Sequence, residues 1–95
     1  MDVPKQIDGF TVLEYGFFAQ PILPAGYVPP TDGRAPLEPV QNLAICKGIE
    51  GFYLLFCTSE WRHVTACFNE TMEYTKRSPL IEFAQDVIEW RKVAE

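Results

Sequence analysis

Hydrophobic residues in the first two thirds of this chain fall into short runs whose composition favours strands. Residues 9–19 read GFTVLEYGFFA, a run of β-branched and aromatic residues in which apolar positions alternate. Such a run predicts a first strand, and Gly16 near its end indicates a bulge.

Three further runs follow between residues 40 and 69, and they read VQNLAICK, GFYLLFC and WRHVTACFN. Short polar or glycine-containing connectors separate them, which predicts a three-stranded antiparallel meander. The middle run is apolar on both of its faces. This pattern is typical of a central strand that is covered from two sides.

The end of the chain changes to helical spacing. Ser78 suits an N-cap, and Pro79 suits the first turn of a helix. An inward stripe follows at helical spacing, made of Leu80, Phe83, Ala84, Val87, Trp90 and Ala94. We therefore expect an α+β fold: an antiparallel sheet of about four strands, a C-terminal helix packed on one face, and a long Pro-rich loop.

The Pro-rich loop, residues 21–39, holds six of the eight prolines and lies between strands one and two of a single predicted domain, residues 1–95. A connection of this length is typical of a functional or disordered segment. It is long enough to cross the second face of the sheet and bury its apolar residues there. The alternative is a loop that presents contacts to another protein, with Tyr27, Asp32 and Arg34 as candidate partner-binding residues.

Composition and charge narrow the function classes. The chain has 95 residues, 47% of them hydrophobic, and a formal net charge of −5. This charge has the wrong sign for a phosphate backbone, so we expect no nucleic-acid partner, whereas a basic protein is a suitable one. We expect neither a signal peptide nor a membrane span, because the longest apolar run is FYLLFC. Three scattered cysteines then favour thiols in the cytoplasm.

Candidate chemistry centres on the single histidine, His63. Cys57, His63 and Glu60 fall near one predicted hairpin turn, which makes a nucleophile, a base and an orienting acid conceivable. Residues near a hairpin also meet in this way without any catalytic role, so we expect no catalytic residues and no enzyme. The cysteines and the histidine lack the paired spacing of a zinc site, and no phosphate-binding glycine loop occurs, so we expect no metal and no cofactor.

Acidic residues on the predicted C-terminal helix are a second candidate for partner binding. Glu82, Asp86 and Glu89 are spaced four and then three residues apart, so they would form one ridge. One explanation is a solvated helix face, because the helix dipole favours acids near the N-terminus. The other is a docking surface for a basic partner.

Residues 42–84 carry a recognisable pattern. It consists of GFYLL at 51–55, Cys57, a turn, and the W-x-x-V-T spacing of WRHVT at 61–65. This stretch resembles a group of small uncharacterised bacterial proteins, and the resemblance implies a structural pattern without assigning a functional residue. As a small acidic domain without an evident active site, the chain is also similar in type to immunity proteins, which bind and block a cognate toxin.

The sequence thus favours a non-enzymatic protein-binding domain, with an immunity-like inhibitor of a cognate toxin as the leading hypothesis. Two alternatives stay open. One is a small enzyme that uses Cys57 and His63. The other is a homodimeric structural or regulatory subunit whose exposed strand edge pairs with another copy, since the sequence leaves the oligomeric state open.

Overall fold

The structure, a computed structural model, describes residues 3–83 and 88–93 of the chain. In this part of the chain, six strands form an antiparallel sheet. Five of them follow one another across the sheet in chain order: β1 (Gln6–Ile7), β2 (Phe10–Ile22), β3 (Val40–Lys47), β4 (Phe52–Cys57) and β5 (His63–Asn69). The sixth, β6 (Arg91–Lys92), pairs with β2.

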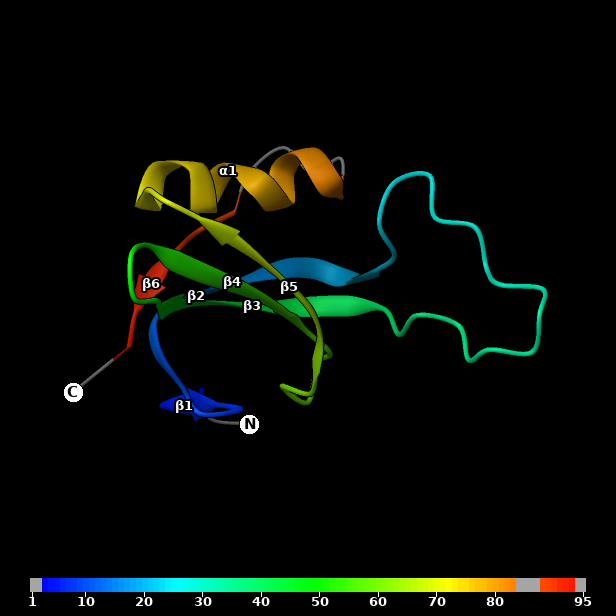
Figure 1. Ribbon diagram of the computed structural model, residues 1–95, viewed down its shortest axis with the longest axis horizontal. Helices are drawn as coiled ribbons and strands as arrows, with labels where there is room; N and C mark the ends of the chain where they lie inside the picture. The colour runs from blue at the N-terminus through cyan, green and yellow to red at the C-terminus, as the bar shows by residue number, and fades with distance from the viewer. Residues whose placement is uncertain (1–2, 84–87, 94–95) are drawn as a thin grey trace.

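The sheet is strongly curled. In Figure 1, helix α1 (Met72–Glu82) lies above the middle strands and β1 lies below them, so the strands wrap around an inner face. The predicted α+β class, with about four strands and a C-terminal helix, is therefore wrong. Within the described residues, the fold is mostly β, a half-barrel of five to six strands with one short helix.

Helix α1 begins at Met72 and not at Pro79. Thr71 caps it, because its side chain accepts a hydrogen bond from the backbone N–H of Tyr74 at 3.2 Å. Ser78, the predicted N-cap, lies inside the helix, where its hydroxyl donates to the carbonyl of Tyr74. Pro79 is inside the helix as well, although an interior proline costs on the order of 3 kcal/mol. The complete burial of its ring offsets part of that cost.

The chain after α1 forms a strand where a helix was predicted. Residues 88–90 are irregular, and β6 then pairs with β2. Residues 88–90 pack closely on β2 at Gly16, because this residue has no side chain. A Cβ at that position would lie only 2.7 Å from Cγ2 of Ile88. The pairing of β2 with β3 is regular at Gly16, so the predicted bulge is not there. Ala84, Val87 and Ala94 of the predicted stripe lie outside the described residues, as does the side chain of Leu80.

Two apolar clusters hold the sheet, one on each face. The outer cluster, on the side of α1, contains Phe18, Val40, Leu43, Ile45, Leu54, Phe56 and Phe83. The inner cluster contains Ile7, Val12, Ala44, Cys46, Leu55, Cys57 and Trp61. Side chains alternate between the two faces along β3 and β4. The prediction that the middle run is buried from both sides is therefore confirmed for residues 54–57.

The Pro-rich loop does not cover the inner face as predicted. Residues 23–39, called the arm from here on, project away from the sheet (Figure 1), and the side chain of Val28 is 78% exposed. The inner face is covered instead by β1 and Trp61. Asp8 and Gly9 have φ angles of 50° and 85°, the geometry of a tight hairpin turn, and this turn folds β1 back beneath the sheet.

Candidate functional site

The arm leaves the sheet between β2 and β3 and returns to the same place. Ile22 and Val40 are paired at its base, which holds its two ends side by side. The molecule measures 42 × 27 × 24 Å, and the arm extends it along the longest of these axes (Figure 1). The arm is thus the most protruding part of the described surface.

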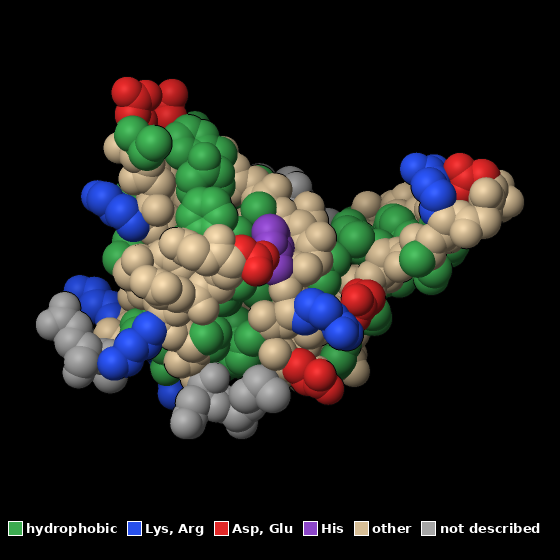
Figure 2. Space-filling model, turned by 60° about the horizontal axis from the view of Figure 1, so that its bottom comes forward, with side chains coloured by type: hydrophobic (Ala, Val, Ile, Leu, Met, Phe, Trp, Pro, Cys, Tyr) green, Lys and Arg blue, Asp and Glu red, His purple; other side chains and the backbone are tan. Residues whose placement is uncertain are grey.

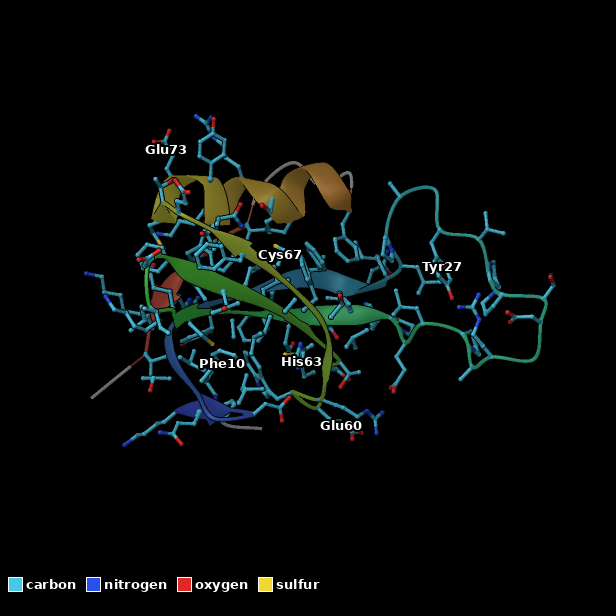
Figure 3. All side chains as sticks on the ribbon, viewed as in Figure 1. Phe10, Tyr27, Glu60, His63, Cys67 and Glu73 are labelled. Atoms are coloured by element: carbon cyan, nitrogen blue, oxygen red, sulfur yellow. The ribbon has the colours of Figure 1, made fainter. Side chains whose placement is uncertain are left out.

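Bonds within the arm fix its shape. Tyr27 lies across the arm (Figure 3), and its hydroxyl accepts a hydrogen bond from the backbone N–H of Leu37 at 2.7 Å. The backbone N–H of Tyr27 donates to the carbonyl of Pro24 at 3.1 Å, closing a turn that Gly26 permits with a φ of 76°. Five prolines restrict the remaining backbone freedom. Tyr27, a predicted partner-binding residue, therefore also holds the arm together.

The tip of the arm carries the other two predicted contact residues, Asp32 and Arg34. Nε of Arg34 lies 2.9 Å from Oδ2 of Asp32, and both side chains are more than half exposed. The guanidinium of Arg34, followed by its backbone N–H, lowers the pKa of Asp32 below the ordinary value. Figure 2 shows a basic and an acidic side chain together at the end of the arm. The tip thus presents one positive and one negative group to solvent.

An open groove of about 450 Å³ lies between the arm and the start of β5. Val28, Pro36 and Leu37 line it from the arm, and His63 and Val64 line it from β5. Arg34 and Glu38 line it as well, so the wall on the arm side combines apolar and charged side chains.

An ion pair joins the base of the arm to the turn between β4 and β5. Nη2 of Arg62 lies 2.5 Å from Oε2 of Glu38, and Glu38 also lines the groove. Both side chains are about half exposed or more, so the pair contributes at most about 1 kcal/mol. Its effect is to orient the base of the arm relative to β5.

His63 lies beside Asp8 of the β1–β2 turn. Nδ1 of His63 is 2.9 Å from Oδ2 of Asp8, and Figure 2 shows a carboxylate against the one histidine. Nε2 of His63 is enclosed and has no hydrogen-bond partner within the described part of the chain. Asp8 was not among the residues predicted to lie near His63. The Asp-Gly pair at 8–9, a strong hairpin signal, could have placed it in a turn but not next to His63.

The conceivable catalytic grouping of Cys57, His63 and Glu60 is not assembled. Cys57 and His63 are cross-strand partners, but burial raises the pKa of the Cys57 thiol to about 12, and Cys46 and Asp8 add to the rise. Glu60 lies at the outside of the β4–β5 turn (Figure 3), and it is Asp8 that contacts His63. A thiol with this pKa stays protonated at neutral pH, so Cys57 is unsuited to act as a nucleophile.

The structure describes only part of the predicted acidic ridge. Helix α1 ends at Glu82, whose side chain lies outside the described residues, and Asp86 lies outside them altogether. Glu89 is exposed in the irregular segment before β6, where its Oε1 lies 3.3 Å from Nη2 of Arg91. Glu89 is therefore not on the same helix as Glu82. A role of these residues in partner binding stays a prediction.

No protein family, no curated protein and no solved structure matches this chain. Among residues 3–83 and 88–93, no three side chains of His, Cys, Asp or Glu come together as a metal site would require. In the same residues, no helix is long and apolar enough to cross a membrane.

Proposed function

We propose that this chain is a protein-binding domain without catalytic activity, and that the arm is its contact element. The observation that carries the proposal is the combination of order and exposure in the arm. Its shape is fixed by the Tyr27–Leu37 hydrogen bond, while Leu23 and Val28 are 40% and 78% exposed. Exposed apolar residues on a protruding loop add little to the fold, and ordered loops on a rigid scaffold often carry binding residues.

The fixed shape of the arm favours binding. A flexible loop loses about 0.5–1.5 kcal/mol for each side chain that becomes immobile in a complex. The turn at Gly26 and the Tyr27–Leu37 hydrogen bond order the arm before the partner arrives. The exposed Asp32–Arg34 pair at the tip then supplies polar groups that orient the partner, while Val28 supplies apolar area.

The finer proposal is that the partner is a toxin, which this chain binds and neutralises in the cytoplasm of a bacterium. The net charge of −5 favours a basic partner, because opposite charges speed association. The cytoplasmic location is supported by the three cysteines, which are all thiols in the structure. The toxin class is supported by the similarity in type to small acidic immunity proteins.

The test co-expresses this chain in bacteria with the protein encoded by the neighbouring reading frame and measures growth. We expect the neighbouring product to arrest growth and this chain to restore it. Val28→Ser combined with Arg34→Ala should abolish the restoration, because it removes apolar area and a charge from the arm. The matched control is Ile49→Ser with Lys47→Ala, the same chemical change at exposed positions beside the β3–β4 turn.

The same growth measurement separates binding from catalysis. Cys57→Ala combined with His63→Ala should keep the restoration, provided that circular dichroism shows a folded chain. The proposal would be contradicted, and the enzyme alternative favoured, if this folded variant failed to restore growth while the arm variant restored it fully. A neighbouring product that does not arrest growth would contradict the toxin proposal.

A further inference from the structure

The N-terminal hairpin is joined to the sheet at one end. β1 pairs with Phe10 and Thr11, the first two residues of β2, whereas the pairing of β2 with β3 begins only at Val12. Residues 3–11, called the flap from here on, therefore extend beyond the part of β2 that β3 holds in place. In Figure 1 the flap hangs below β2 and lies beneath the curled sheet.

The flap has a hairpin shape of its own. Asp8 and Gly9 adopt the positive φ angles that a two-residue hairpin turn needs. The backbone N–H of Val12 donates to the carbonyl of Lys5 at 2.9 Å and ties the two legs of the hairpin together. These interactions lie within the hairpin and do not depend on the rest of the sheet, so the flap can move as one unit.

Side chains hold the flap against the body of the molecule. Ile7 is 6% exposed and belongs to the inner cluster, and the ring of Phe10 lies 4.9 Å from the ring of Tyr53, measured between their centres. Oδ2 of Asp8 lies 2.9 Å from Nδ1 of His63, and β5, which carries His63, is at the other end of the strand order from β1. The Asp8–His63 contact thus joins the two ends of the curled sheet. It is a weak contact, because the Asp8 side chain is 65% exposed.

The thiol of Cys57 lies beneath this contact. Cys57 is the cross-strand partner of His63, belongs to the inner cluster together with Ile7, and has no exposed surface. Burial raises the pKa of its thiol, and the charges of Cys46 and Asp8 add to the rise, so Asp8 lies close to it. The tip of the flap is therefore part of the cover that keeps Cys57 from solvent.

We propose that the flap is a lid on the inner face of the half-barrel, that it opens while the rest of the sheet stays folded, and that the Asp8–His63 contact keeps it closed. Opening withdraws Ile7 from the inner cluster but leaves the pairing of β2, β3, β4 and β5 intact. A short terminal segment with few buried contacts is the kind of unit that opens at low cost. A group attached to the sulfur of Cys57 fits only when the flap is open, so modification of this thiol traps the open form.

The first experiment measures how fast iodoacetamide alkylates Cys57 in the full wild-type chain. The thiolate displaces iodide from the reagent, and digestion followed by mass spectrometry reports each cysteine separately. The rate at Cys57 should change little with urea at low concentrations, because opening of the flap exposes much less surface than global unfolding does. A rate that follows the full urea dependence of global unfolding at all concentrations would overturn the proposal.

The second experiment weakens the Asp8–His63 contact with Asp8→Asn. Asparagine keeps the size of the side chain and tolerates the positive φ of the turn, so the substitution removes the charge alone. Alkylation of Cys57 should become about threefold to fivefold faster. Glu73→Gln, the same change in the exposed ion pair with Arg77 on α1, is the matched control and should leave the rate unchanged. An unchanged rate in Asp8→Asn would overturn the role of the contact.

Ile45→Val separates opening of the flap from global unfolding. Ile45 is fully buried in the outer cluster, so the substitution destabilises the whole sheet without touching the flap. Alkylation of Cys57 should be unchanged, and a rate that rises with the loss of stability would overturn the proposal. Partner binding is assigned to the arm, and Asp8 does not line the groove, so Asp8→Asn should still restore growth in the co-expression test. The two proposals therefore fail independently.

Discussion

The middle strands of the sheet and the arm adjoin each other in the sequence, yet different forces order them. In β3 and β4, side chains such as Leu43 and Leu54 have no exposed surface, and both faces pack against apolar neighbours. In the arm, most side chains are exposed, and the shape depends on the Tyr27–Leu37 hydrogen bond, tight turns and five prolines. Burial of apolar side chains thus stabilises the sheet, whereas restricted backbone freedom fixes the shape of the arm.

The largest expected difference between the two regions is in the cost of losing an apolar side chain. Phe56→Ala should lower the free energy of unfolding by about 3–5 kcal/mol, because Phe56 is buried between the sheet and Phe83. Val28→Ala in the arm should change it by less than about 0.5 kcal/mol. Urea unfolding measures both, and equal losses would mean that the arm packs on the body.

Gly16→Ala should be the next most costly change. The added Cβ meets Cγ2 of Ile88 at 2.7 Å, and such overpacking costs about 1–3 kcal/mol. Ile88→Ala removes the clashing atom, so Gly16→Ala should cost much less when it is made in an Ile88→Ala chain. The same cost in both backgrounds would contradict the crossing of residues 88–90 over β2.

Burial of the Cys57 thiol also predicts a fall in the free energy of unfolding at high pH. Burial raises the pKa of Cys57 from the ordinary 9.0 to about 12 in the folded chain. The free energy of unfolding should therefore be independent of Cys57 ionisation below pH 9. It should fall as pH rises from 9 toward 12, because the unfolded chain loses the thiol proton first, by at most about 1.4 kcal/mol per pH unit. Cys57→Ala should be less stable at pH 7 but show a shallower fall between pH 9 and pH 11. Unfolding curves at each pH measure this, and parallel falls in both chains would contradict it.

The smallest effect on global stability should come from Tyr27→Phe. Loss of the hydroxyl removes the 2.7 Å hydrogen bond to Leu37, which lowers the free energy of unfolding by no more than about 1 kcal/mol. The arm itself should loosen, so limited proteolysis should cut residues 23–39 several times faster. Tyr74→Phe on the exposed side of α1 is the matched control. An unchanged cleavage rate in Tyr27→Phe would show that the prolines alone fix the arm.

The meander could be predicted because its apolar runs are dense and its connectors are short. β3, β4 and β5 follow one another as expected, and the two-sided burial of β4 follows from its unbroken apolar sequence. These features depend on local pattern, which a single sequence contains.

The start of the helix could not be decided locally. Thr71 and Ser78 both suit an N-cap, and Pro79 favours Ser78 by its place in the sequence. In the structure the helix begins after Thr71, and Pro79 lies inside it with its ring fully buried. The prediction placed the helix too far toward the C-terminus, and the predicted ridge of Glu82, Asp86 and Glu89 depended on that placement.

The arm and the surroundings of His63 depend on contacts between distant residues. Length and prolines marked residues 21–39 as unusual, but not whether they would pack on the sheet or leave it. His63 and Asp8 are 55 residues apart, so no local pattern joins them. The hairpin at Asp8–Gly9 also supplies the β1 strand that covers the inner face, which removes the need for the arm to cover it.

The central claim is that the body folds without the arm, and that the arm serves a partner. Replacing residues 23–39 by Asn-Gly would join Ile22 to Val40 through a tight hairpin turn, since these two residues are already paired. The shorter loop should leave the free energy of unfolding unchanged or raise it by about 1–2 kcal/mol, while growth restoration is lost. An unfolded variant, or one that still restores growth, would contradict the claim.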